Sequence, residues 1–147
     1  MTIDLLLREL GRRIGLPDLD FGPGGEVRLE IDGLAVDLTR GPGGEELLVS
    51  ALAGELPAGD EAGAALRLLA ANALFSQTDG ATLGVPAGSS AVVLARELAA
   101  GSLDAAALET VLDRFTATAL AVPALLRAQP MADRPAAHED FLNMTRV

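Results

Sequence analysis

The chain has 147 residues and a formal net charge of −10, and half of its residues are hydrophobic. This length fits one domain with an ample core, and the lack of cysteine excludes disulfides, thiolate metal sites and a cysteine nucleophile. All eleven basic residues are arginine. The segment from Asp18 to Glu61 contains eleven acidic residues and only two basic ones, Arg28 and Arg40, which gives it a local net charge of −9. Such a field repels phosphate, so the sequence disfavours a nucleic-acid partner.

The amino-terminal segment does not have the pattern of a signal peptide. Asp4 interrupts the start and charge returns at Arg8, whereas a signal peptide needs a basic start and a longer apolar run. No uncharged apolar stretch approaches the roughly 18 residues of a membrane-spanning helix. We therefore expect a soluble, cytoplasmic protein.

Residues 2–14 predict an amphipathic helix. Thr2 can cap its amino end, and Gly15 and Pro17 stop it. Leu5 widens the apolar stripe beyond what a core face needs. The stripe itself follows the i, i+3, i+4 spacing of a helix at Ile3, Leu6, Leu7, Leu10 and Ile14.

The next segment predicts a β-hairpin. Residues 27–31 and 34–38 alternate between apolar and polar side chains, which is the period of a half-buried strand. Asp32 and Gly33 between them fit a two-residue type I′ turn. In that register directly opposite residues share a face. The shared apolar patch comprises Val27, Leu29, Ile31, Leu34, Val36 and Leu38, and the other face carries Glu30, Asp32 and Asp37.

The sequence Gly-Pro-Gly-Gly-Glu occurs twice, at 22–26 and 41–45, and brackets the hairpin. A phosphate-binding loop has its glycines between a strand and a helix, followed by Lys and Ser or Thr. Here each repeat precedes a strand, so the repeats are interpreted as turns.

A third strand is expected at 46–53, apolar on both sides as a central strand is. A second helix is expected at 60–76, with Asp60 as its cap. This helix is apolar in almost every direction and must be buried all round, which makes a partner subunit a natural second cover. Two more strands are expected at 81–85 and 91–98.

A third helix begins after Ser102 or Asp104, and Pro123 inside its pattern predicts a kink or an early stop. Residues 1–128 are therefore predicted to be one domain and residues 129–147 a flexible tail. The order of helix, three strands, helix, two strands and helix predicts an α+β fold with an antiparallel sheet packed by helices.

No constellation of residues indicates catalysis, a metal or a cofactor. The single histidine, His138, lies in the tail beside Glu139 and Asp140, where solvated side chains explain the cluster better than a metal site. Carboxylate pairs are plentiful, but none has an identifiable apolar surrounding that raises a pKa for acid–base chemistry. The surplus of aliphatic surface on Leu5, the hairpin and the second helix indicates protein binding instead.

The ordered elements resemble the class I type III secretion chaperones, the family that includes the Tir chaperone. The resemblance spans about residues 3–128. It is carried by Leu6-Leu7-Arg8-Glu9-Leu10-Gly11 with Leu16-Pro17, by Leu29-Glu30-Ile31-Asp32-Gly33, by the run from Leu66 to Phe75, and by Thr82-Leu83-Gly84-Val85 with Val92-Val93-Leu94.

This resemblance implies a virulence-associated homodimer without cofactor that binds the extended amino-terminal segment of a secreted effector and keeps it competent for export. An effector strand can also extend a sheet edge. Carried onto this chain, the effector grooves fall on Leu5, Leu6, Leu29, Ile31, Val36 and Leu38. The dimer surface falls on Leu68, Ala71, Asn72, Phe75 and Val85.

Two alternatives to the chaperone hypothesis remain open. The first is a regulatory or adaptor module on the same scaffold that binds a folded partner. The second is a small-ligand binder or enzyme with a pocket between sheet and helix, although the lack of Trp, Tyr and Cys deprives it of the usual site residues. The tail residues Phe141-Leu142 offer a hydrophobic pair for folding back into a groove, but we expect a disordered end instead.

Overall fold

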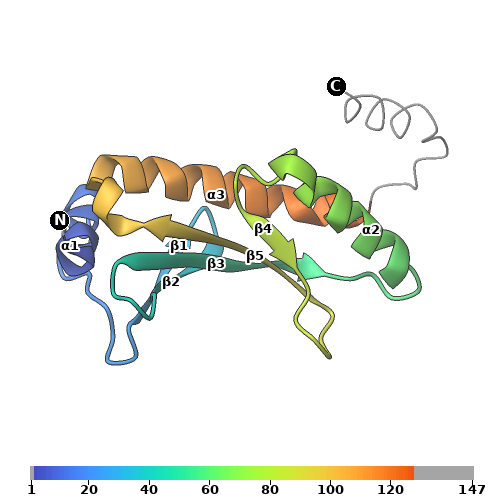
Figure 1. Ribbon diagram of the computed structural model, residues 1–147, viewed down its shortest axis with the longest axis horizontal. Coiled ribbons are helices and arrows are strands. Elements are labelled where there is room, and N and C mark those ends of the chain that lie inside the picture. The colour runs from blue at the N-terminus through green and yellow to red at the C-terminus, as the bar shows by residue number, and fades with distance from the viewer. Residues whose placement is uncertain (1, 128–147) are drawn as a thin grey trace, which may run out of the picture.

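Three α-helices and one five-stranded antiparallel sheet make up the fold in the computed structural model, which describes residues 2–127 (Figure 1). The predicted α+β class and element order are confirmed. In chain order the elements are α1 (Ile3–Ile14), β1 (Glu26–Ile31), β2 (Leu34–Arg40), β3 (Glu46–Glu55), α2 (Glu61–Asn72), the 3₁₀ turn η1 (Ala73–Phe75), β4 (Thr82–Gly84), β5 (Ala91–Ala99), the 3₁₀ turn η2 (Ala100–Ser102) and α3 (Ala105–Leu126).

The sheet has the strand order β1-β2-β3-β5-β4, which leaves β1 and β4 as its two edges. The predicted central position of the third strand is confirmed. The long helix α3 lies along one face of the sheet, with α1 near one end of the molecule and α2 near the other (Figure 1). The apolar core fills the space between this face of the sheet and the helices.

The hairpin has the register that the alternation predicted. Leu29 lies opposite Val36, and Ile31 lies opposite Leu34. Asp32 and Gly33 both have positive φ, 51° and 81°, which is the backbone of a type I′ turn. The two glycine-rich repeats form the same tight turn, since Gly25 and Gly44 donate to the carbonyls of Gly22 and Gly41.

Helix α1 begins and ends where the sequence indicated. The Thr2 hydroxyl accepts a hydrogen bond from the Leu5 amide at 3.2 Å, and Gly15 ends the helix with a left-handed φ of 82°. The Asp104 side chain caps α3 in the same way, accepting from Ala107 N. Among residues 2–127 no helix combines the length and the apolarity that crossing a membrane requires.

Two helix boundaries differ from the predictions. Helix α2 ends at Asn72 rather than near residue 76, because the backbone leaves the helical conformation at Ala73, with ψ 115°, and Leu74 and Phe75 have positive φ. Helix α3 does not stop at Pro123 but continues to Leu126. Its last turn is held because Arg67 of α2 donates to the carbonyl oxygens of Leu125 and Leu126.

Asp60 occupies the amino-terminal position of α2, but its side chain makes no capping hydrogen bond there. It pairs with Arg67 at 3.0 Å instead. The predicted tail, including His138 and Phe141-Leu142, lies outside the described residues.

Candidate functional site

An apolar groove of about 430 Å³ lies where the end of α1, the edge strand β1 and helix α3 meet. Its floor is formed by buried leucines of all three elements, Leu10, Leu29 and Leu112. Its rim includes Ile14 and Leu16, whose side chains are 38% and 47% exposed. Two such aliphatic side chains at a concave site offer apolar area to a binding partner.

The residues that follow α1 shape this groove. After Gly15 the chain turns back, and Leu16 N donates to the Gly11 carbonyl at 2.7 Å. A side chain at position 11 meets the Leu16 carbonyl and the Leu19 side chain, so glycine at this position lets the exit pack against the helix. The result places Leu16 two residues beyond the helix, facing solvent at the groove's rim.

The outer edge of β1 is free to pair with another strand. The residues that flank a two-residue hairpin turn exchange hydrogen bonds, and bonded and non-bonded pairs then alternate along the strands. Ile31 and Leu29 therefore bond to β2, whereas Arg28 and Glu30 direct their N–H and C=O groups outward. The same alternation explains why the Glu26 carbonyl accepts from Gly22 N outside the hairpin. Within residues 2–127 no loop or turn bonds to the backbone of Arg28 or Glu30.

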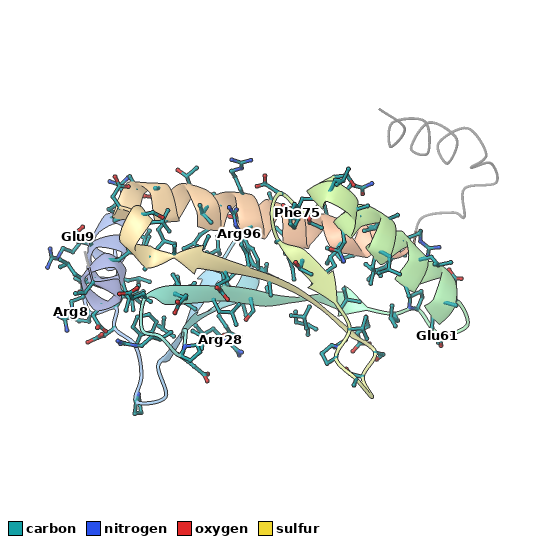
Figure 2. All side chains as sticks on the ribbon, viewed as in Figure 1. Arg8, Glu9, Arg28, Glu61, Phe75 and Arg96 are labelled. Atoms are coloured by element: carbon teal, nitrogen blue, oxygen red, sulfur yellow. The ribbon has the colours of Figure 1, made fainter. Side chains whose placement is uncertain are left out.

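The face of β1 and β2 that points away from α3 is polar. Arg28 lies on it (Figure 2) and pairs with Asp37 directly across the hairpin, at 2.7 Å from Nε to Oδ1 and 3.0 Å from the second nitrogen to Oδ2. Hydrogen bonding from Arg28 holds the pKa of the Asp37 carboxyl below its ordinary value.

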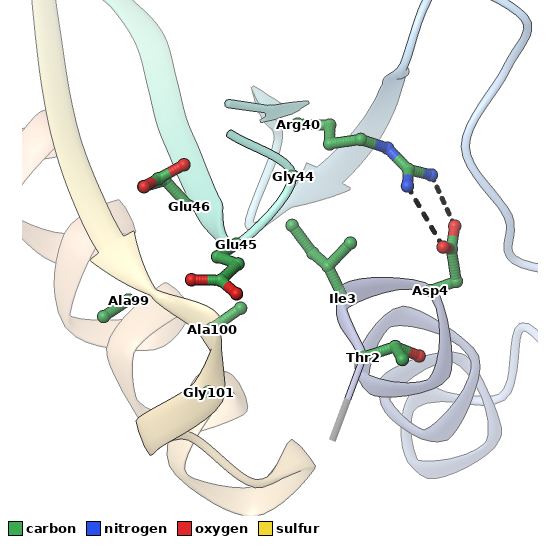
Figure 3. Close-up of a pocket in the computed structure, with 10 residues that line it drawn as sticks. All are labelled: Thr2, Ile3, Asp4, Arg40, Gly44, Glu45, Glu46, Ala99, Ala100 and Gly101. Carbon is green, nitrogen blue, oxygen red and sulfur yellow. Dashed lines mark hydrogen bonds and ion pairs between the residues drawn. The ribbon is translucent and has the colours of Figure 1, made fainter. Parts of the chain in front are cut away.

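A second hollow, of about 540 Å³, lies between the start of α1, the turn before β3 and the end of β5 (Figure 3). Arg40 binds both oxygens of Asp4 there and holds the pKa of that carboxyl below its ordinary value. Arg40 also stacks 4.9 Å from the centre of the Phe21 ring. Glu45 and Glu46 complete its charged lining, and within the described part of the chain no three potential metal ligands cluster.

Helix α2 carries an apolar face that residues 2–127 leave uncovered. Leu66 and Leu69 are exposed on it, opposite the buried side of the helix. Beyond its end, Leu74 and Phe75 adopt left-handed φ values of 53° and 55° and are 88% and 55% exposed. Phe75 lies beside β4 (Figure 2), whose neighbouring residue Val85 is exposed as well.

The six residues predicted for the effector grooves divide into two groups. Four of them are buried in the core, and only Leu29 of these also lines the groove: Leu6 on α1, and Leu29, Val36 and Leu38 on the hairpin. Leu5 is exposed on α1 and lies outside the groove. Ile31 is half-buried and lines the groove.

The residues predicted for the dimer surface are also divided. Leu68 and Ala71 are buried against the chain's own core, and Asn72 holds β4. Phe75 and Val85 are exposed. Sequence reasoning missed Ile14 and Leu16 at the groove, Leu66 and Leu69 on α2, and Leu74 on η1. The signal for the last three was present, because they are the large members of an apolar surplus on α2 and η1.

A comparison with known protein families identifies the family of this chain. The profile of the Tir chaperone protein (CesT) family matches residues 5–122. The chain belongs to this family. The match includes all five strands, helix α2 and most of α1 and α3, so the groove and the α2 face both lie on the family's domain.

Solved structures of the same fold include several chaperones. The chain resembles the structure of the ExsC–ExsE complex, with a TM-score of 0.67, 24% identity, and coverage of 90% of this chain and 100% of the other. It also resembles the Yersinia pestis type III secretion chaperone SycH with a fragment of YscM2, with a TM-score of 0.67, 20% identity, and coverage of 82% and 99%.

The Pseudomonas aeruginosa ExoU–SpcU complex of the type III secretion system resembles the chain with a TM-score of 0.63, 25% identity, and coverage of 86% of this chain and 98% of the other. No curated protein sequence matches the chain.

Proposed function

We propose that this protein is a cytoplasmic type III secretion chaperone that binds an extended amino-terminal segment of an effector and keeps it soluble and competent for export. The observation that carries the proposal is the apolar groove beside a free strand edge, in a chain of the CesT family. The relatives point the same way, since SpcU was solved in complex with ExoU.

The groove and the edge suit an extended polypeptide better than a folded surface. A segment that pairs with β1 gains main-chain hydrogen bonds from Arg28 and Glu30, and alternate side chains of that segment point to the groove. Its aliphatic side chains then cover Ile14, Leu16 and Ile31. This mode of binding needs no nucleotide and no catalytic group, so we propose a binding protein rather than an enzyme.

The uncovered face of α2 and η1 is our proposed dimer surface. It comprises Leu66, Leu69, Leu74, Phe75 and Val85, which replaces the buried Leu68 and Ala71 of the sequence prediction with their exposed neighbours. Two consecutive left-handed residues that are not glycine cost free energy. A second copy that buries Leu74 and Phe75 offsets that cost.

Native mass spectrometry on the tagged protein, isolated gently from its own cells, tests this function. We expect two copies of the chain with one copy of a larger protein, and limited proteolysis of that complex should leave an amino-terminal segment of the larger protein protected. A folded domain as the protected part would favour the adaptor alternative. A monomer without bound polypeptide would contradict the proposal.

A further inference from the structure

The groove beside β1 is ringed by carboxylates and contains no basic residue in its lining. Glu30 and Asp32 stand on the strand side, and Glu109 and Asp113 stand one helical turn apart on α3. Glu109 is neutralised, because Arg13 pairs with it at 2.8 Å. Within residues 2–127 the other three carboxylates belong to no ion pair.

The face of β1 that points away from the groove is acidic as well. Arg28 is paired with Asp37, so among the described residues Glu26 and Glu30 are the charges of this strand that belong to no ion pair. A strand that pairs with β1 places the residue opposite Glu30 on the same face as Glu30, and the residues opposite Leu29 and Ile31 on the groove face. The two faces of an incoming strand therefore meet different chemistry.

From this geometry we infer that the groove selects an extended segment in which aliphatic residues alternate with basic ones, the aliphatic residues entering the groove and the basic ones lying on the opposite face of the strand, beside Glu30 and near Asp32. This inference rests on the proposed function and specifies the effector segment by its chemistry. It also assigns a role to the acidity of the hairpin region, where the local net charge is −9. Opposite charge across an interface favours correct partners and speeds their encounter.

The test uses the purified full-length chain and three fluorescein-labelled peptides of about nine residues, the length of a strand with short flanks. All three have the same aliphatic residues at alternate positions, and the positions between them are all Lys, all Gln or all Glu. Fluorescence anisotropy gives the dissociation constants. We expect the Lys peptide to bind about tenfold more tightly than the Gln peptide and the Glu peptide more weakly still, with the preference shrinking as salt is raised.

The variant Glu30→Gln with Asp32→Asn should reduce the preference for Lys over Gln to about two- or threefold, because it removes two unpaired carboxylates on the face where the basic residues lie, and Asn tolerates the positive φ of position 32. The control Glu55→Gln with Glu97→Gln removes the same charge from exposed positions outside the groove, and should keep the full preference.

The possible failures are distinguishable. If the three peptides bind equally and Leu16→Glu abolishes binding of all three, the groove binds segments as proposed and charge selection is wrong. If the two acid variants behave alike, the preference comes from the overall charge and the assignment to the groove is wrong. If no peptide binds, this inference and the placement of the proposed binding site both fail, while the mass-spectrometric test of the chaperone function stands separately.

Discussion

At the scale of single residues, Asn72 replaces a missing strand neighbour for β4. Its side-chain oxygen accepts from Leu83 N at 2.8 Å, and its side-chain nitrogen donates to Leu83 O at 2.9 Å. One amide thus satisfies both backbone groups of a residue whose side chain is buried. This contact fixes the short edge strand to the end of α2, next to the proposed dimer surface.

We predict that Asn72→Ala destabilises the protein by about 1–3 kcal/mol, because it leaves a partly buried donor and acceptor without partners. Urea unfolding followed by circular dichroism measures the change. The neighbouring Gln77→Ala, at an exposed position, is the control and should change stability by less than about 0.5 kcal/mol. Equal stability of the two variants would show that water replaces the Asn72 amide without cost.

The pair of Arg28 and Asp37 predicts a pH dependence with a definite sign. The folded-state pKa of Asp37 is depressed, so its contribution to stability is present above the unfolded pKa of about 3.9 and is lost as pH falls through the folded value. Asp37→Asn should therefore unfold at lower urea concentration than the natural chain at pH 7, and the difference should shrink as pH falls below about 3.9. A difference that stays constant with pH would contradict this assignment.

At the scale of elements, Arg67 joins two helices at the end of the molecule far from the groove. Its side chain is only 11% exposed and donates to the carbonyls of Leu125 and Leu126 at the end of α3, while it also pairs with Asp60. These bonds satisfy carbonyl groups that a helix end leaves open. They also explain why α3 continues for one turn beyond Pro123.

We predict that Arg67→Met lowers the free energy of unfolding by about 2 kcal/mol and frays the last turn of α3, because charge-assisted bonds to the carbonyls are lost. Urea unfolding gives the first quantity and hydrogen exchange of residues 122–127 gives the second. Arg114→Met is the matched control: Arg114 pairs with Asp79 at 2.6 Å but is 65% exposed, so its loss should cost less than about 1 kcal/mol. Comparable effects of both variants would refute the capping role.

The hairpin shows how much of an element the sequence alone could predict. Alternation and the Asp32-Gly33 turn predicted the register residue by residue, because side-chain period and turn type leave few choices. They could not show whether the apolar face was core or binding surface. That depends on α1 and α3, which are distant in sequence and cover Leu29, Val36 and Leu38. For the same reason Leu16, two residues beyond a helix, gave no signal as a groove residue.

At the scale of the whole molecule, the two apolar surfaces lie apart. The groove adjoins α1, and the α2 face lies toward the opposite end of the long helix α3 (Figure 1). In a dimer formed through α2 the two grooves would remain free. An extended segment could then contact both, which fits one effector for two copies of the chain.

This separation predicts that assembly and binding fail independently. Leu69→Glu with Phe75→Glu should convert the dimer to a monomer in analytical ultracentrifugation, because it places charge in the proposed apolar interface. Ile14→Glu with Leu16→Glu should remain a dimer and lose the effector segment. A monomeric groove variant, or an α2 variant that stays dimeric at micromolar concentration, would contradict the placement of the surfaces.

The central claim is that an effector segment binds as a strand along the free edge of β1. Hydrogen–deuterium exchange of the chain, with and without its bound effector segment, tests it most directly, because the outward amides of Arg28 and Glu30 lack partners within the described fold. We predict strong new protection of a peptide covering residues 26–31, with little change in β4 at the opposite edge. Protection confined to β4 or α2, with β1 exchanging as in the free chain, would contradict the claim.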